Sequence, residues 1–309
     1  MMDLGTGLGI LVRGEDFTLL YDAGSNDDRK AGPDNRALAY LRLLVGESGE
    51  AARCGGDEDH AEIPLTTVVL SHPHRDHESL LPDVFACYAV GAFWDSGAGS
   101  DTAAHRAVEE AVAAEPGLER RTVRAGDTSS LGRLAGATIL SSRPDARDAN
   151  DASVVMRLDL GRASVLFMGD APGGERRPPS SPPSRGSVEA TLLATKKRLL
   201  DTDVLVVGHH GSMTSSRAEF LDAISPRIAL VSSGPFPYGR VELPDPEVIA
   251  ELERRRVAVE QTKVDDDACR EAPAKVGRDE DGAPGGCSAV TLRIESSGAI
   301  EVERGPTAD

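Results

Sequence analysis

The sequence is poor in aromatic residues and in long apolar runs. Aromatic residues make up 4% of the 309 residues, with a single tryptophan, so few flat side chains exist on which single-stranded nucleic acid can stack. No apolar run approaches the roughly 18 to 20 residues that cross a bilayer, which predicts a soluble chain with no membrane span. The opening MMDLGTGLGILV has no basic head and no cleavage site, so a signal peptide is absent or already removed.

Positive charge is also scarce. The chain carries 34 Lys and Arg against 51 Asp and Glu, a formal net charge of -17. This balance opposes nonspecific attraction to DNA, RNA or anionic lipid, so nucleic acid is a possible but disfavoured partner. A polyanionic substrate would need a local positive focus, and bound divalent metals can supply one.

Cysteine is sparse, and its four copies are isolated from one another. Cys54, Cys87, Cys269 and Cys287 form no C-x-x-C pair, which argues against a zinc knuckle. A disulfide between Cys269 and Cys287 would close a Gly/Asp/Pro-rich insertion and favour an exported protein. The alternative is four free thiols in a cytoplasmic enzyme. The sequence leaves both open, and with them the compartment.

Apolar runs and helical spacings alternate along the chain in two similar sets. Two short runs around RGED predict a hairpin, and further strands and helices follow, including a helix whose Ser216 and Glu219 are spaced as a capping box. Pro-, Gly- and Ser-rich residues 172–187 predict an exposed loop. We expect one α/β domain over residues 1–309, made of two halves, with loop insertions at about 172–187 and 263–287.

The first chemical motif is HPHRDH, which directly follows the apolar strand LTTVVL. His72 and His74 are two residues apart and can aim at one point, whereas Asp76 and His77 can address a second point nearby. Neutral imidazole and carboxylate suit zinc, and also manganese or iron. The competing interpretation is a polar loop that happens to be rich in histidine.

Two later strands also end in side chains that bind metals. VLFMGD places Asp170 at a strand end, where a buried carboxylate is costly unless it is paired or metal-bound. VLVVGHHGS places His209 and His210 at another. Together with HPHRDH, these residues predict a site for two divalent metal ions, Zn or Mn, which needs a bridging anion and further ligands. His105 lies on a predicted amphipathic helix and is expected to be a surface or packing histidine.

In this order, HPHRDH, MGD and GHHGS resemble the metallo-β-lactamase fold superfamily, and within it the soluble hydrolase domain of ComEC-type competence proteins. DLGTGLG from Asp3, the Asp-Ala-Gly loop at residues 22–24, and the pair Asn150 and Ser153 add support. The resemblance covers about residues 3 to 303. It implies a four-layer αβ/βα sandwich, with two β-sheets flanked by helices.

The resemblance also implies roles for the site residues. His72 and His74 would hold one metal, Asp76 and His77 would hold the other with one of the two adjacent histidines, and Asp170 would bridge. His209 is favoured as that ligand because it directly follows the strand, which leaves His210 as a group outside the metal shell. The reverse assignment stays open.

The chain departs from the family pattern at several positions. The usual Gly-Gly after the first motif is replaced by Glu78-Ser79, and Arg240 follows Tyr238-Gly239 where relatives tend to have histidine. Only His105 lies between the first motif and Asp170, where many members have a further ligand. This departure implies an under-coordinated first metal.

The predicted reaction is hydrolysis by water that the two metals activate. Asp76 would orient the water or move its proton, and His210 or Arg240 would stabilise the developing anion. The first hypothesis is a phosphodiesterase, or a nuclease, although the net charge and the shortage of aromatics weigh against the latter. The alternatives are a hydrolase of lactones, thioesters or amides on the same metals, and a non-catalytic binding protein that keeps the fold.

Overall fold

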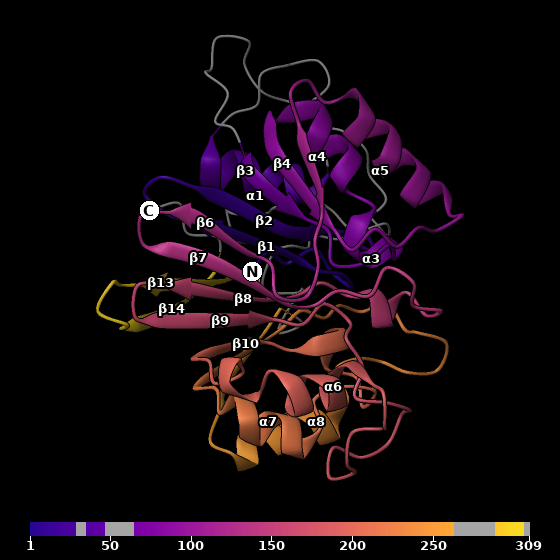
Figure 1. Ribbon diagram of the computed structural model, residues 1–309, viewed down its shortest axis with the longest axis vertical. Helices are drawn as coiled ribbons and strands as arrows, with labels where there is room; N and C mark the ends of the chain where they lie inside the picture. Colours follow the sequence, from indigo (N-terminus) through magenta and orange to yellow (C-terminus); the bar gives the residue numbers. More distant parts are fainter. Residues whose placement is uncertain (29–34, 47–64, 263–287, 306–309) are drawn as a thin grey trace.

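Two β-sheets lie face to face, and helices cover both outer faces (Figure 1). The computed structural model describes residues 1–28, 35–46, 65–262 and 288–305. The four-layer αβ/βα sandwich predicted from the sequence is confirmed. The predicted insertion at about 263–287 lies outside the described residues, as does a disulfide between Cys269 and Cys287.

The first sheet has five strands in the order β1-β2-β3-β4-β5. β1 and β2 form the predicted antiparallel hairpin, and the other neighbouring strands run parallel. The last two strands were not predicted, because β4 (VGAFWD) shows no regular alternation of apolar and polar residues and β5 (ERRT) has no apolar residue. The strands are β1 (Gly9–Arg13), β2 (Thr18–Ala23), β3 (Leu65–Val69), β4 (Val90–Asp95) and β5 (Glu119–Thr122).

The second sheet has seven strands in the order β12-β11-β10-β9-β8-β7-β6. Its half from β9 to β12 is parallel, its half from β6 to β9 is antiparallel, and β13 and β14 form a separate hairpin. The strands are β6 (Thr128–Gly132), β7 (Ala135–Ser141), β8 (Val155–Leu160), β9 (Ala163–Phe167), β10 (Val204–Val206), β11 (Ile228–Val231), β12 (Ala258–Gln261), β13 (Val290–Ile294) and β14 (Ile300–Arg304).

The helices divide between the two outer faces (Figure 1). Those of the first half are α1 (Arg36–Val45), α3 (Arg75–Glu78), α4 (Leu81–Cys87) and α5 (Ala103–Ala114), and those of the second half are α6 (Val188–Thr195), α7 (Ala218–Ile224) and α8 (Pro246–Arg254). Within the described ranges, none of these helices has the length and hydropathy of a membrane span.

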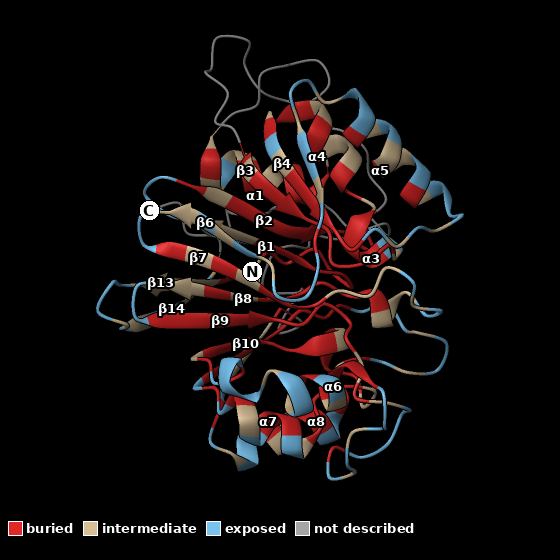
Figure 2. Ribbon diagram, viewed as in Figure 1, coloured by how far each residue is buried: buried red, intermediate tan, exposed pale blue. Residues whose placement is uncertain are grey.

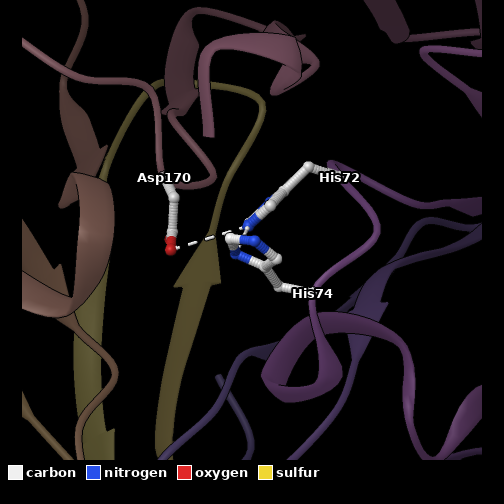
Figure 3. A group of neighbouring side chains, drawn as sticks. All are labelled: His72, His74 and Asp170. Atoms are coloured by element: carbon white, nitrogen blue, oxygen red, sulfur yellow. Dashed lines mark hydrogen bonds and ion pairs between the residues drawn. The ribbon is translucent and has the colours of Figure 1, made fainter. Parts of the chain in front are cut away.

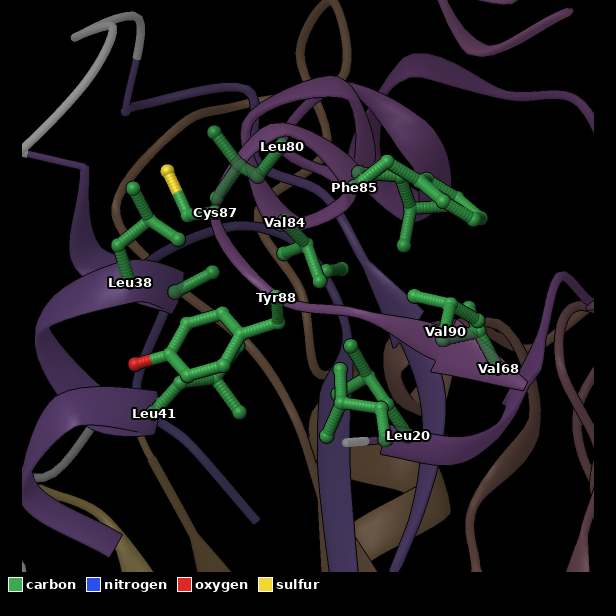
Figure 4. Packing of buried hydrophobic residues seen from close by; sticks show 14 of the residues in the cluster. Leu20, Leu38, Leu41, Val68, Leu80, Val84, Phe85, Cys87, Tyr88 and Val90 are labelled. Carbon is green, nitrogen blue, oxygen red and sulfur yellow. The ribbon is translucent and has the colours of Figure 1, made fainter. Parts of the chain in front are cut away.

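Three buried apolar clusters hold the four layers together (Figure 2). Successive residues of a strand point to opposite faces. Leu20 accordingly packs outward beneath α1 and α4 (Figure 4), whereas Tyr21 faces the other sheet. In β10, Val206 faces the space between the sheets and Leu205 packs under the helices of the second half. Burial on both faces explains why these strands are continuously apolar.

One prediction is wrong, and one alternative that the sequence left open is excluded. Helix α7 has no capping box: its N-cap is Arg217, and the amides of Ser216 and Arg217 donate to the carboxylate of Glu189 from another helix. Cys87 is disulfide-bonded, so four free thiols are excluded.

Candidate metal centre

Three strand ends supply the side chains of the predicted site. His72 follows β3 of the first sheet, Asp170 follows β9, and His209 and His210 follow β10 in a short 3₁₀ turn over Gly208–Gly211. Because β9 and β10 are parallel neighbours, their carboxyl ends meet at one edge of the second sheet. β3 brings the first motif to the same edge from the facing sheet.

Two glycines allow the loops of the site to approach closely. A Cβ at Gly24 would lie 2.4 Å from the backbone nitrogen of His77, so only glycine lets the Asp-Ala-Gly loop pack against α3. Gly169 has φ +52, and a Cβ there would lie 2.9 Å from Cβ of Ser71. At both positions, the absence of a Cβ lets a neighbouring loop lie directly against the metal-binding motif.

His72, His74 and Asp170 form one group of possible ligands, with one atom from each lying within 4.8 Å of the others. His72 Nε2 is 3.1 Å from His74 Nδ1 and 3.6 Å from Asp170 Oδ2. Figure 3 shows the three side chains pointing toward one another. For Zn–N bonds of about 2.0–2.1 Å, neighbouring tetrahedral ligand atoms lie about 3.3–3.4 Å apart, so these separations suit a metal ion.

Asp76, His77 and His210 form the second group, again within 4.8 Å. His77 Nε2 is 3.2 Å from His210 Nε2, which is 3.5 Å from Asp76 Oδ2. The sequence favoured His209 at this position, but the geometry brings His210 into the group. His210 is 3% exposed.

Asp170 lies between the two groups and offers one oxygen to each. Its Oδ2 faces His72, whereas its Oδ1 is 3.1 Å from His77 Nε2 and 3.8 Å from His210 Nε2. Oδ1 is buried, and no contact to it among the described residues has hydrogen-bond geometry. A buried carboxylate oxygen left in this way is costly unless a cation binds it. The donor set therefore fits divalent metal, which His72, His74 and Asp170 would hold on one side and Asp76, His77 and His210 on the other.

In each buried histidine of the two groups, the ring nitrogen that points away from the other ligands contacts a further polar group. His77 Nδ1 lies 2.8 Å from Asp22 Oδ2, His72 Nδ1 lies 3.0 Å from Ser71 Oγ, and His210 Nδ1 lies 3.0 Å from the carbonyl oxygen of Ser232. Such outer partners are typical of metal ligands, because they fix the ring orientation and the tautomer. All three Nε2 atoms consequently point inward.

Burial and the neighbouring charges shift the pKa values of the cluster. Burial lowers the pKa of His72 well below its usual value and also lowers the pKa of His209, which favours the neutral, metal-binding form. Burial opposes ionisation of Asp170, but the surrounding histidines lower its pKa well below the usual range. Burial opposes the charged form of His77 as well, yet Asp170 and Asp22 raise its pKa. The site thus pairs carboxylates with imidazoles at high charge density.

Two contacts beside the site were not anticipated. The Tyr238 hydroxyl donates to Asp76 Oδ2 and lies 3.4 Å from Asn26 Nδ2. Burial and the Asp76 charge raise the pKa of Tyr238, so it stays a protonated donor. Glu78, in place of the usual glycine, pairs with His105 at 2.8 Å. His105 is thus the packing histidine that the sequence predicted. In the sequence, Tyr238 stood out only as part of a family motif, and nothing indicated that Glu78 meets His105.

A family model described as the metallo-beta-lactamase superfamily matches residues 2–234. The match includes all three strand ends that meet at the candidate metal centre.

Two relatives share sequence over most of the chain. Competence protein ComA of Neisseria gonorrhoeae is 27% identical over 236 residues, which are 75% of this chain and 26% of that protein. Recombination protein 2 of Haemophilus influenzae is 27% identical over 266 residues, 85% of this chain and 27% of that protein. The chain therefore spans about a quarter of the length of these relatives.

The crystal structure of CmlA, a diiron beta-hydroxylase from Streptomyces venezuelae, matches with a TM-score of 0.49 at 13% identity, over 85% of this chain and 52% of that chain.

Proposed function

Because the chain belongs to the metallo-beta-lactamase superfamily, we propose that it is a metal-dependent hydrolase with a dinuclear centre and that its substrates are phosphodiesters. The observation that carries this proposal is the position of Asp170, whose two oxygens face two separate groups of possible ligands. A single-metal or purely structural cluster would have no need of a buried carboxylate directed both ways.

We assign His72, His74 and Asp170 to the first ion, and Asp76, His77 and His210 with Asp170 to the second. His210 replaces His209 in the second set because its Nε2 faces both Asp76 and His77. When bound, two Zn²⁺ or Mn²⁺ ions supply activated water and stabilise negative charge on a phosphoryl oxygen. The role of anion stabilisation that the sequence offered to His210 falls to other groups.

The chain's own residues position the water and its proton. We assign the orientation of the attacking water to Asp76, whose carboxylate is held by the Tyr238 hydroxyl. The ring centroids of Tyr238 and His210 are 6.2 Å apart, and the two rings are nearly parallel, with an interplanar angle of 20°. Arg240 is exposed two residues beyond Tyr238, where a cation can meet an anionic substrate at the edge of the site.

The preference for a phosphodiester over a lactone or thioester rests on the relatives, one of which is named a recombination protein. The net charge of -17 opposes binding of long nucleic acids, so short or small phosphodiesters are the favoured class. A carbonyl substrate remains the competing class, since the same ions polarise a carbonyl oxygen.

The test uses zinc- or manganese-loaded protein, its metal content, and panels of phosphodiesters, lactones and thioesters assayed on one sample. We expect two ions per chain and hydrolysis of the phosphodiesters. Asp170→Asn should abolish both. Asp159→Asn is the matched control and should change neither. Asp159 pairs with Arg157 and lies at the end of β8 that is remote from the metal centre. Metal content near zero after reconstitution would exclude the enzyme, and turnover of lactones alone would overturn the substrate class.

A further inference from the structure

His209 is left without a role once His210 joins the second group, yet its surroundings resemble those of the other imidazoles. Its Nδ1 lies 2.7 Å from the Thr214 hydroxyl, and its Nε2 lies 3.6 Å from Asp170 Oδ2. His72, His77 and His210 show the same arrangement, with Nδ1 held from outside and Nε2 directed inward. An outer hydrogen bond of this kind is the usual companion of a metal-binding histidine.

The oxygen that His209 approaches identifies the ion concerned. Asp170 Oδ2 is also 3.6 Å from His72 Nε2 and therefore belongs to the first group, whereas Oδ1 faces His77 and His210. His209 thus lies on the side of His72, and His210 lies on the side of Asp76. Within the described part of the chain, Asp76 forms an ion pair with His210 and none with His209.

The backbone explains how adjacent residues reach different places. His209 and His210 have φ 52 and 53, both in the left-handed region. Two successive non-glycine residues there are costly and persist where the surroundings require them, commonly at functional sites. The His209 amide also donates to the Gly169 carbonyl at 3.0 Å, which ties this turn to the loop that carries Asp170.

We propose that His209 is an additional ligand of the first metal ion, so that the two adjacent histidines serve different ions. This inference rests on the proposed dinuclear function. With His209, the first ion has four ligand residues, His72, His74, His209 and Asp170, in place of the three that the first motif and Asp170 provide. The sequence motifs leave the first ion one ligand short, and His209, which follows β10 of the second sheet, supplies that ligand. At 22% side-chain exposure, His209 lies on the open side of the site.

Zinc titration against a chromophoric chelator, with zinc as the only probe, tests the proposal. His74→Ala identifies the binding step of the first ion, and His210→Gly identifies that of the second. His209→Gly should weaken the same step as His74→Ala, by about 100-fold or more, since loss of outer partners alone costs about 10- to 100-fold. Glycine is chosen at both positions because it accepts the left-handed backbone, which makes His209→Gly and His210→Gly a matched pair.

Thr214 provides a second test that leaves every ligand in place. Thr214→Val removes the hydroxyl beside His209 Nδ1 and should weaken the first ion by about 10- to 100-fold, whereas Thr214→Ser keeps the hydroxyl and should restore wild-type affinity. Anomalous peaks in zinc-soaked crystals then locate the ion that is lost.

The outcomes separate this inference from the function on which it rests. Two ions bound to His209→Gly with wild-type affinities would overturn the inference and leave the dinuclear hydrolase intact. Loss of the second ion in His209→Gly would overturn it as well and would restore the assignment favoured by the sequence. A wild-type protein that binds fewer than two ions would overturn the proposed centre itself.

Discussion

At the residue scale, the candidate site is a set of inward-facing atoms whose orientation is fixed from behind. Asp22 shows this most clearly. It is fully buried, its Oδ1 accepts from the Ser71 amide at 2.7 Å, and its Oδ2 lies 2.8 Å from His77 Nδ1. The sequence pointed to Asp22 only as part of a supporting loop motif, because nothing in its spacing indicates that it meets His77.

We expect Asp22→Asn to weaken binding of the second metal ion by about 10- to 100-fold while leaving the first nearly unchanged. The amide keeps the size of the carboxylate and tolerates the backbone φ of 58 at this position, but it can accept hydrogen bonds at only one of its two terminal atoms. The His77 ring then loses its fixed tautomer. Two-step zinc titration measures the effect, and equal weakening of both steps would show that Asp22 supports the whole fold of the site instead.

Local spacing allowed part of the site to be predicted and left part of it undecided. His72, His74, Asp76 and His77 lie within six residues after one strand, so their proximity follows from the chain itself. The choice between His209 and His210 does not, because it depends on two left-handed residues whose side chains diverge. No periodicity in the sequence signals that conformation.

At the element scale, continuously apolar strands were predictable because helices bury their outer faces, whereas contacts between distant elements were not. The start of α7 illustrates the difference. Ser216 and Glu219 have capping-box spacing, but Ser216 has φ 60 and its amide donates to Glu189 of α6. Arg217, 1% exposed, turns to the carbonyls of Arg177 and Pro178 and anchors the loop at 172–187. A tertiary contact has displaced the local one.

This contact predicts a pH-dependent stability. Burial raises the pKa of Glu189 from 4.5 to about 7, so between these values the folded protein holds a proton that the unfolded chain has lost. The stabilisation is complete below about pH 4.5 and is lost as the pH rises through about 7, by about 3 kcal/mol. Urea unfolding from pH 5 to 8 should show this decline in the wild type.

Glu189→Gln is the matched variant, since it cannot titrate. The amide cannot accept from both Ser216 and Arg217 as the carboxylate does, so the variant should be less stable at low pH. Its free energy of unfolding should fall less between pH 5 and 8 than that of the wild type, by about the contribution of Glu189. Parallel pH profiles for the two proteins would contradict the assignment to Glu189.

At the scale of the whole molecule, a strongly negative chain is proposed to act on negatively charged substrates. Its net charge of -17 repels an anion at distance, whereas the two proposed divalent ions would attract it only close to the site. The two halves of the fold meet at the candidate metal centre, because β3 belongs to one sheet and β9 and β10 belong to the other. Attraction is therefore local, and repulsion is long-ranged.

Salt should consequently raise, and not lower, the efficiency of hydrolysis. The Debye length falls from about 30 Å at about 0.01 M to about 10 Å at about 0.1 M salt, which screens the distant charges and leaves the contacts at the ions. We expect kcat/KM for a small anionic phosphodiester to rise by about two- to tenfold over this range.

The control is an uncharged ester that the same sample hydrolyses, and its kcat/KM should not change with salt. A protein that binds polyanions through a basic groove releases counterions and loses affinity as salt increases. A decrease of kcat/KM with salt would therefore reveal a positively charged substrate path and would restore long nucleic acids as the preferred substrate.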